Sequence, residues 1–193
     1  GSGNKTMTAA GTVSDGNSGL NYSVTFATNT TGSITAKSLT IGGTFTANNK
    51  VYDATTSATI LVNSLTLTGV VGAETVTLTP VLVFADKNAS GTPKTVSLTG
   101  SSIAGIDSGN YTLSLTGAPT ASANLTARPI TVSAVTGTKV YDGTTSSAGV
   151  PTITTGALQG TDSVAWTQTY DNKNIGSGNK TMTAAGTVSD GNS

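Results

Sequence analysis

The feature that most constrains this chain is a seven-residue motif that occurs twice. Residues 50–56 read KVYDATT, and residues 139–145, 89 positions later, read KVYDGTT. Residues 1–18 and 176–193 are identical at an offset of 175, which is close to twice the first spacing. Self-similarity at a fixed period indicates tandem structural units. The sequence therefore predicts a repeat protein in which neighbouring units have diverged and alternate units match.

Shorter matches indicate where each repeat begins and ends. ITAK at 34–37 matches LTAR at 125–128, and FADKN at 84–88 matches YDNKN at 170–174. The pair NY occurs at 21–22 and 110–111, and the pair KT occurs at 5–6, 94–95 and 180–181. We therefore predict the C-terminal half of a repeat at 1–37, a complete repeat at 38–127 and the N-terminal portion of the next repeat at 128–193. We expect the sequence to be a window on a longer array.

Composition and charge exclude several classes of function. The nine basic and nine acidic residues give a net charge of zero, so the chain has no basic face for nucleic acid and no cationic helix for a membrane surface. It has no Cys and no His, which removes disulfides, thiol chemistry, the usual zinc and copper sites and His-based catalysis. No apolar run approaches the roughly 18 residues of a membrane-spanning helix. We expect no enzyme activity, no nucleic-acid partner and no membrane insertion.

Residue usage and periodicity favour a β-protein. About one residue in five is Thr, a β-branched residue that suits a pleated surface with a wet outer face. Within 38–127 we count about seven short strands and no helical period. The expected fold is all-β, with small antiparallel β-sandwich repeats of about 90 residues that resemble immunoglobulin domains. The alternative is a β-grasp-like repeat in which residues 101–109 form a short helical turn.

Some predicted strands carry internal irregularities. We expect a bulge or kink at Gly42 and Gly43, and two short strands on either side of Asn63. The clearest strand, 75–84, alternates apolar and Thr side chains, but Pro80 interrupts it and indicates a sheet edge. Asp107 begins the sequence DSGNY, which leads into a strand and resembles the tyrosine corner of immunoglobulin-like sandwiches. There the Tyr hydroxyl bonds to nearby backbone.

The repeated motif itself predicts a turn. Asp53 is a short acceptor that can close a turn on the backbone N–H groups that follow, with Thr55 and Thr56 adding hydroxyl groups. Val51 and Tyr52 are expected to anchor the turn to the edge of the core. The alternative is a ligand site built on Tyr52 and Asp53.

Three stretches together carry a family resemblance: KVYDGTT, FADKN, and GIDSGNYTLSL followed by ANLTAR. They resemble the YDG-type tandem repeats of large bacterial secreted and surface proteins, the haemagglutinin-like giant adhesins. The resemblance spans the complete repeat and recurs in both partial ones. It implies a non-enzymatic, secreted or cell-surface stalk or fibre. The chain departs from the pattern at Ala54, where the second copy has Gly143, so local turn geometry can differ.

Three further chemistries were considered, and none assigns a catalytic, cofactor-binding or metal residue. Bound calcium would use Asp loops at 15–17, 86–88 and 107–110, each of which has a single carboxylate where a calcium site usually has several. A Lys–Asn isopeptide bond would join Lys87 or Lys94 to Asn110 beside Asp107. A flat Thr array for ice or glycan would use Thr75, Thr77 and Thr79.

The sequence thus predicts a structural repeat region of a bacterial extracellular fibre or adhesin stalk. Its partners would be neighbouring repeats and other copies of the chain, because the half-repeat 1–37 and the portion 128–193 each lack strands that another copy can supply. The alternative is an adhesive module that binds glycan or host protein in a cleft lined by Tyr52, Tyr141 or Trp166.

Overall fold

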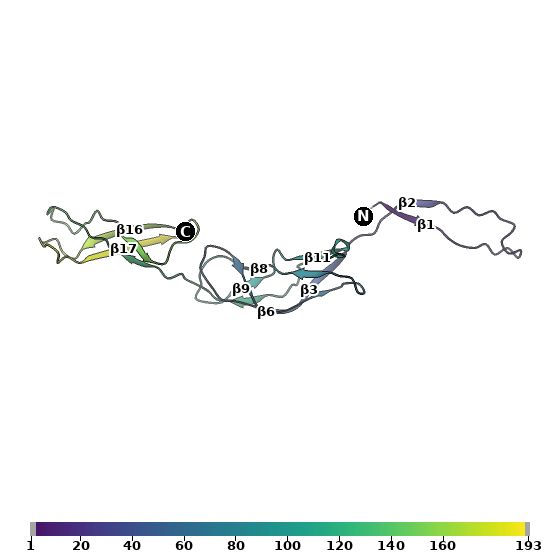
Figure 1. Ribbon diagram of the computed structural model, residues 1–193, viewed down its shortest axis with the longest axis horizontal. Coiled ribbons are helices and arrows are strands. Elements are labelled where there is room, and N and C mark those ends of the chain that lie inside the picture. Colours follow the sequence, from purple (N-terminus) through teal and green to yellow (C-terminus); the bar gives the residue numbers. More distant parts are fainter. Residues whose placement is uncertain (1–2, 192–193) are drawn as a thin grey trace. The chain divides into compact units, whose positions relative to one another are not determined.

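The computed structural model describes residues 3–191 (Figure 1). Residues 1–2 of the predicted piece 1–37 and residues 192–193 of the predicted piece 128–193 lie outside the described residues. The all-β prediction is confirmed, since the described residues form strands and one 3-10 turn, η1 (Ser108–Asn110). The strands are β1 (Lys5–Thr8), β2 (Thr28–Gly32), β3 (Lys37–Ala47), β4 (Lys50–Val51), β5 (Ser57–Ala58), β6 (Ile60–Thr68), β7 (Thr77–Thr79), β8 (Leu82–Phe84), β9 (Lys94–Ser97), β10 (Ser102–Ala104), β11 (Tyr111–Ser114), β12 (Ala121–Ala123), β13 (Leu125–Thr126), β14 (Thr131–Ser133), β15 (Thr152–Thr155), β16 (Ser163–Tyr170) and β17 (Met182–Ser189).

Contacts divide the chain into two compact units, each built from several stretches of sequence. The first unit comprises residues up to 43, 64–81 and 100–119, and the second comprises residues 44–63, 82–99 and 120 onward. Strands β3 and β6 contribute residues to both units.

In the first unit, β1 and β2 form an antiparallel pair with exposed side chains. Strands β7 and β10 form a second antiparallel pair, in which Leu78 lies opposite Ile103. Strand β11 pairs with β3 in parallel, with Tyr111 opposite Lys37. Because η1 directly precedes β11, it fixes where Tyr111 enters the sheet.

The second unit contains the four-stranded sheet β12-β9-β8-β5, in which every pairing is antiparallel. Strand β13 pairs with β4 in parallel, with Leu125 opposite Lys50 and Thr126 opposite Val51. Strands β14 and β15 form one antiparallel pair, and β16 and β17 form a longer one that extends from Ser163 to Tyr170 (Figure 1).

The buried apolar side chains concentrate in residues 39–125. Apart from Pro151, those that are buried among the described residues are Leu39, Ile41, Phe45, Ala47, Leu82, Phe84, Val96, Leu98, Tyr111, Ala123 and Leu125. In β3 they alternate with exposed residues, as expected for a strand with one wet face. Each fully buried Leu or Val contributes about 1.5–3 kcal/mol relative to an exposed one. Stability is therefore expected to come mainly from residues 39–125.

Two predicted strands differ from those observed. The predicted strand 75–84 is divided at Pro80 into two strands that belong to different sheets. Strand β7 ends before Pro80, and β8 begins after Val81. Proline has no N–H for a ladder, so the pairing cannot continue through it. The predicted break at Asn63 is wrong, because β6 passes through it without interruption.

The kink predicted within 38–46 is present at Gly43, which has a φ of 77° inside β3. A Cβ there would lie 2.0 Å from the carbonyl oxygen of Ser64, so any other residue would have to displace backbone. The prediction of purely antiparallel sheets is wrong for two pairs, β11 with β3 and β13 with β4. Side chains alternate in the same way in parallel and antiparallel strands, so the sequence pattern did not distinguish them.

Candidate functional site

The first KVYD motif forms a closed turn held by one lysine. The Asp53 carboxylate accepts hydrogen bonds from the Thr55 backbone N–H at 2.9 Å and its hydroxyl at 2.8 Å. Lys50 Nζ lies 2.7 Å from the same Asp53 oxygen and donates to the Thr55 carbonyl at 2.9 Å. It also donates to the Ser57 carbonyl at 2.9 Å. The predicted Asx turn at Asp53 is confirmed, and Lys50 is the residue that ties it to the chain beyond.

The second motif builds the same arrangement. Lys139 Nζ lies 2.8 Å from the Asp142 carboxylate and donates to the Thr144 carbonyl at 2.8 Å. Asp142 accepts from the Thr144 backbone N–H and hydroxyl, each at 2.9 Å. We call these two arrangements the Lys50 clasp (Lys50, Asp53, Thr55) and the Lys139 clasp (Lys139, Asp142, Thr144).

Each clasp lies over an aromatic ring. Lys50 Nζ is 6.0 Å from the centre of the Phe84 ring, and Lys139 Nζ is 5.5 Å from that of Tyr170. An ammonium group within about 6 Å of a ring face is attracted by its negative charge density. The FADKN and YDNKN stretches therefore supply the ring on which each lysine rests, which explains why the two motifs recur together.

The clasps also shift the acidity of their carboxyl groups. The hydrogen bond from Lys139, with those from Thr144, lowers the pKa of Asp142 from 3.8 to about 2. Burial opposes the shift at Asp53, but bonds from Lys50 and Thr55 outweigh it and also lower the pKa of that carboxyl group. Both carboxyl groups are therefore anionic acceptors at neutral pH, and neither is suited to deliver a proton.

Tyr52 and Val51 were both expected at the core edge, and this is wrong for Val51, which is exposed. Tyr52 is half-buried and its hydroxyl donates to Asp162 at 3.1 Å. Burial, followed by the bond to Asp162, raises the pKa of Tyr52. Arg128 Nε donates to the Tyr52 carbonyl at 2.8 Å. Tyr52 is thus held at its hydroxyl by Asp162 and at its carbonyl by Arg128.

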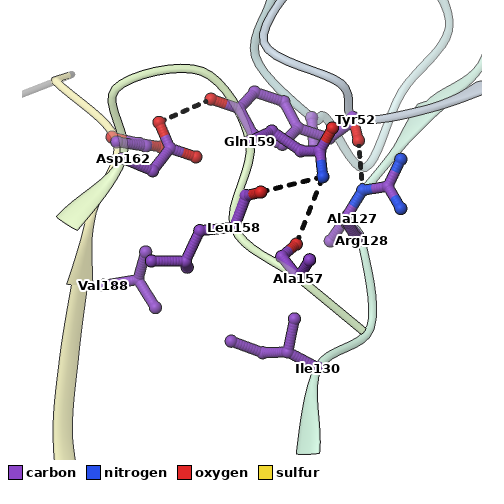
Figure 2. A pocket seen from close by; sticks show the side chains of 11 residues that line it. Tyr52, Ala127, Arg128, Ile130, Ala157, Leu158, Gln159, Asp162 and Val188 are labelled. Atoms are coloured by element: carbon purple, nitrogen blue, oxygen red, sulfur yellow. Dashed lines mark hydrogen bonds between the residues drawn. The ribbon is translucent and has the colours of Figure 1, made fainter. Parts of the chain in front are cut away.

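Tyr52 lines a cavity of about 260 Å³ in the second unit (Figure 2). The wall opposite is largely apolar, with Ile130, Leu158 and Val188. Figure 2 shows Gln159 turned back onto its own chain, where Nε2 donates to the carbonyl oxygens of Leu158 at 2.9 Å and Ala157 at 3.3 Å. The polar groups beside the cavity therefore already bond to one another, which favours a structural role for them.

A larger open groove of about 770 Å³ lies beside the second motif, and we call it the Val140 groove. Its lining includes Lys139, Val140 and Tyr141 and several residues between Tyr170 and Met182. Val140 and Tyr141 are both exposed. The third predicted cleft residue, Trp166, is half-buried in β16 and pairs with Gly186 of β17, so it lines neither cavity.

The Asp loops considered for calcium are closed by their own backbone. Asp15 accepts from the N–H groups of Gly19 at 2.7 Å and Asn17 at 2.8 Å, and these bonds lower its pKa. Asp86 accepts from the Asn88 N–H at 2.8 Å and from Lys94 at 2.7 Å. Residues 3–191 contain no group of three or more acidic, His or Cys side chains placed to hold a metal.

The isopeptide candidates have other partners. Lys94 pairs with Asp86, and Lys87 Nζ donates to the Asp190 carbonyl at 3.3 Å. Asp107 accepts from the Thr75 backbone N–H at 2.8 Å, and its carbonyl accepts from the Asn110 N–H at 3.0 Å. Lys94 and Asp107 thus have roles in an ion pair and a turn, and Lys87 bonds to distant backbone.

Only part of the proposed Thr array is a regular strand surface. Thr77 and Thr79 are exposed in β7, and Thr75 precedes the strand. The Thr77 hydroxyl donates to the Ala104 carbonyl of the neighbouring strand at 3.3 Å. The row therefore spans one short strand pair.

Tyr111 is the aromatic residue whose partner the sequence misassigned. Its hydroxyl accepts from the Val71 backbone N–H at 3.0 Å and donates to the Glu74 carboxylate. The tyrosine-corner expectation of a nearby backbone partner is wrong, because Val71 lies 40 residues upstream. The Glu74 bond, followed by burial, raises the pKa of Tyr111. The short turn at 71–74 gave no signal of this contact.

Gln168 was not predicted either. It is the buried polar side chain of the described residues, where its Oε1 accepts from the Val135 N–H at 2.8 Å and its Nε2 donates to the Val135 carbonyl at 3.0 Å. Gln168 thereby satisfies both backbone hydrogen-bonding groups of Val135. When FADKN is aligned with YDNKN, Gln168 falls at the position of Leu82, which is also buried. That alignment was the signal from which a buried Gln168 could have been predicted.

Comparison with known proteins identifies the family. A sequence model of the YDG domain matches residues 35–121 and again 126–193, which together are well over half of the chain. The chain belongs to the YDG domain family. No curated protein and no solved structure matches it. The two clasps are therefore equivalent parts of two YDG domains. In residues 3–191 of this YDG protein, no helix has the length and apolar character needed to cross a membrane.

Proposed function

We propose that this YDG chain is a structural repeat region of a bacterial extracellular fibre or adhesin stalk. Each repeat of about 90 residues is a small immunoglobulin-like β-sandwich, and function lies in reach and assembly. The proposal includes no catalysis, no bound cofactor, and location at the cell surface or in the secreted fraction.

The observation that carries the proposal is the recurrence of the whole clasp. Lys50 and Lys139 make the same set of bonds to Asp, Thr and an aromatic ring in two successive domains. Every bond in a clasp is internal, so the turn is a device for closing a domain. Tandem domains closed by one repeated device suit an array whose length sets its reach.

The exposed apolar side chains support assembly between copies. In 3–37 the exposed large hydrophobic residues are Met7, Val13, Leu20, Tyr22, Val24, Phe26 and Ile34, and in 138–175 they are Val140, Tyr141, Val150, Val164 and Ile175. Strand edges that lack a partner template pairing with another chain. The partners proposed are neighbouring repeats and further copies of the chain.

Negative-stain electron microscopy of the 193-residue chain tests this function, first in calcium-free buffer and then with calcium added. We expect filaments without calcium, because the Asp loops are closed by hydrogen bonds of the protein. Separate short rods at all concentrations would contradict assembly and leave a passive stalk. Filaments that form only with calcium would show that assembly requires the metal, and this would contradict the proposal of calcium-independent filaments.

The second candidate is an adhesive module that binds glycan or protein, and the Tyr52 cavity favours it. An aromatic face beside Arg128 and Asp162 is suited to a sugar ring with hydroxyl groups. A glycan array with the wild-type chain and Tyr52→Ala tests it. Binding that is lost in Tyr52→Ala but kept in the matched variant Tyr141→Ala would support this candidate, whereas no binding would exclude glycan as its ligand.

A further inference from the structure

The link between the first YDG domain and the second is short and stiff. Strand β13 ends at Thr126 and β14 begins at Thr131, so the link is the sequence ARPI at 127–130. Pro129 has a fixed φ, and a proline also restricts the residue before it, here Arg128, to extended conformations. Residues from both sides of this link form one compact unit. The two domains are therefore in contact at the link.

Tyr52, in the turn of the Lys50 clasp, bonds across this link (Figure 2). Its hydroxyl donates to Asp162 of the second domain at 3.1 Å, and Arg128 Nε donates to its carbonyl at 2.8 Å. Asp162 belongs to a turn that is closed by a bond from its own N–H to the Gln159 carbonyl at 3.1 Å. We call residues 159–162 the Gly160 turn. Tyr52 thus contacts both the link and the second domain.

Ala54 lies against the same turn. A Cβ on Gly160 would be 2.8 Å from the Cβ of Ala54, closer than two carbon atoms pack without repulsion. Ala54 itself has a φ of 63°, a conformation that disfavours any residue with a Cβ. The second motif has Gly143 at this position. The methyl group by which the two motifs differ is therefore the group that contacts the Gly160 turn.

A turn of the same build in the first domain provides a comparison. GAETV at 72–76 aligns with GTDSV at 160–164, and Gly72 and Gly160 both have a φ of 56°. In each turn the acidic residue donates its N–H to the carbonyl three residues earlier, at 3.2 and 3.1 Å. A Cβ on Gly72 would meet no described atom within 4 Å. The two turns therefore share a backbone shape and differ in their contacts.

Resting on the proposed function, we propose that Tyr52 and Ala54 are the docking site for the Gly160 turn of the next YDG domain, and that this contact holds the second domain in a fixed orientation on the Lys50 clasp. The clasp closes its own domain through Lys50, while the side chains between its bonded residues hold the neighbour. A stiff joint of this kind makes the reach of an array increase with the number of its domains.

Distances between two spin labels test the joint, since the chain has no cysteine of its own. Ser122→Cys in β12 and Thr167→Cys in β16, both at exposed positions, place one label on a strand of each domain. Pulsed electron paramagnetic resonance measures the distribution of distances between them. We expect one narrow distribution in the labelled chain. Gly160→Ala should widen it several-fold, because the added methyl group displaces Ala54.

The matched control is Gly72→Ala, which places an alanine at the same φ without a neighbour and should leave the width unchanged. Adding Ala54→Gly to Gly160→Ala moves the methyl group from one side of the contact to the other and should restore the narrow distribution. Equal widening by Gly160→Ala and Gly72→Ala, no recovery in the double variant, or a broad distribution in the labelled chain would overturn the proposal. Circular dichroism shows whether each variant is folded.

Tyr52→Phe tests the joint without changing the backbone of either turn. Loss of the bond to Asp162 should widen the distribution, whereas Tyr141→Phe, at the same position of the second motif, should not. Equal widths in these two variants would overturn the role of Tyr52. Electron microscopy separates the two proposals. Filaments from a chain with a broad distribution would refute the joint while the fibre function stands, whereas a narrow distribution in a chain that forms only separate rods would support the joint and refute assembly.

Discussion

Residues 38–127 and residues 128–193 each contain one copy of the motif and build the same clasp, but they differ in what surrounds it. In 38–127, β13 lies along the motif, and Leu125 and Tyr111 are 0% and 7% exposed. Their sequence counterparts near the N-terminus, Ile34 and Tyr22, are 68% and 64% exposed. Val140 of the second motif is 89% exposed.

The difference separates two contributions to the domain. The clasp uses contacts within seven residues and one ring, so it forms with or without the second half of its repeat. Burial needs strands from both halves, because β4 receives its partner from residues about 75 positions later. Local chemistry therefore specifies the turn, while the core depends on the completing strand.

The largest expected effect is on burial. Leu125→Ala removes a fully buried side chain and should lower the free energy of unfolding by about 2–5 kcal/mol. The matched change Ile34→Ala, at an exposed position, should cost less than about 0.5 kcal/mol in the monomer. Urea unfolding followed by circular dichroism at low protein concentration measures both. Equal losses would contradict the comparison.

Tyr111→Phe should have the next largest effect. It removes the hydroxyl that bonds to the Val71 N–H and the Glu74 carboxylate, at a cost of about 1–3 kcal/mol. Tyr22→Phe, at the equivalent exposed position, should leave the urea midpoint unchanged. If both changes were neutral, the bond to the 71–74 turn would not contribute to stability.

The residue between the Asp and the Thr of each clasp allows a smaller test, with opposite substitutions in the two clasps. Ala54 and Gly143 both have positive φ, 63° and 75°, and a Cβ at Gly143 would meet no atom within 4 Å. Gly143→Ala should therefore cost about 1 kcal/mol through backbone conformation alone, and Ala54→Gly should gain a similar amount. Thermal unfolding of each variant provides the measurement. A gain from Gly143→Ala would show that the turn differs between the two domains.

The smallest effect concerns pH. The folded pKa of Asp142, about 2, lies below the unfolded value of 3.8, so its contribution to stability is present above pH 3.8 and is lost as the pH falls toward 2. Carboxyl NMR titration should find this low midpoint. Lys139→Met should return it toward 3.8, while Lys173→Met, with a lysine outside the clasp, should not. A normal midpoint in the wild-type chain would contradict the clasp.

The features that the sequence predicted correctly are those that depend on short stretches. The all-β class, the turn at Asp53 and the break at Pro80 follow from residue type and nearest neighbours, and the family resemblance was correct at the level of the YDG domain. The self-assembly, the bacterial surface context and the sandwich architecture remain predictions.

Features that join distant stretches were missed or misassigned. Parallel pairing of β13 with β4 requires knowledge of strand direction, which alternation does not contain. The Tyr111 hydroxyl reaches a turn 40 residues away, and Gln168 satisfies the Val135 backbone across 33 residues. The sequence analysis gave the lysine of the motif no role, and the ring on which it rests lies 34 residues beyond Lys50.

Amide hydrogen exchange of two equivalent residues tests the central claim most directly. The Tyr52 N–H is bonded to Thr126 of β13, and the Tyr141 N–H belongs to the unfilled Val140 groove. In the 193-residue chain we predict slow exchange at Tyr52 and fast exchange at Tyr141. Equal protection of the two amides would contradict the account.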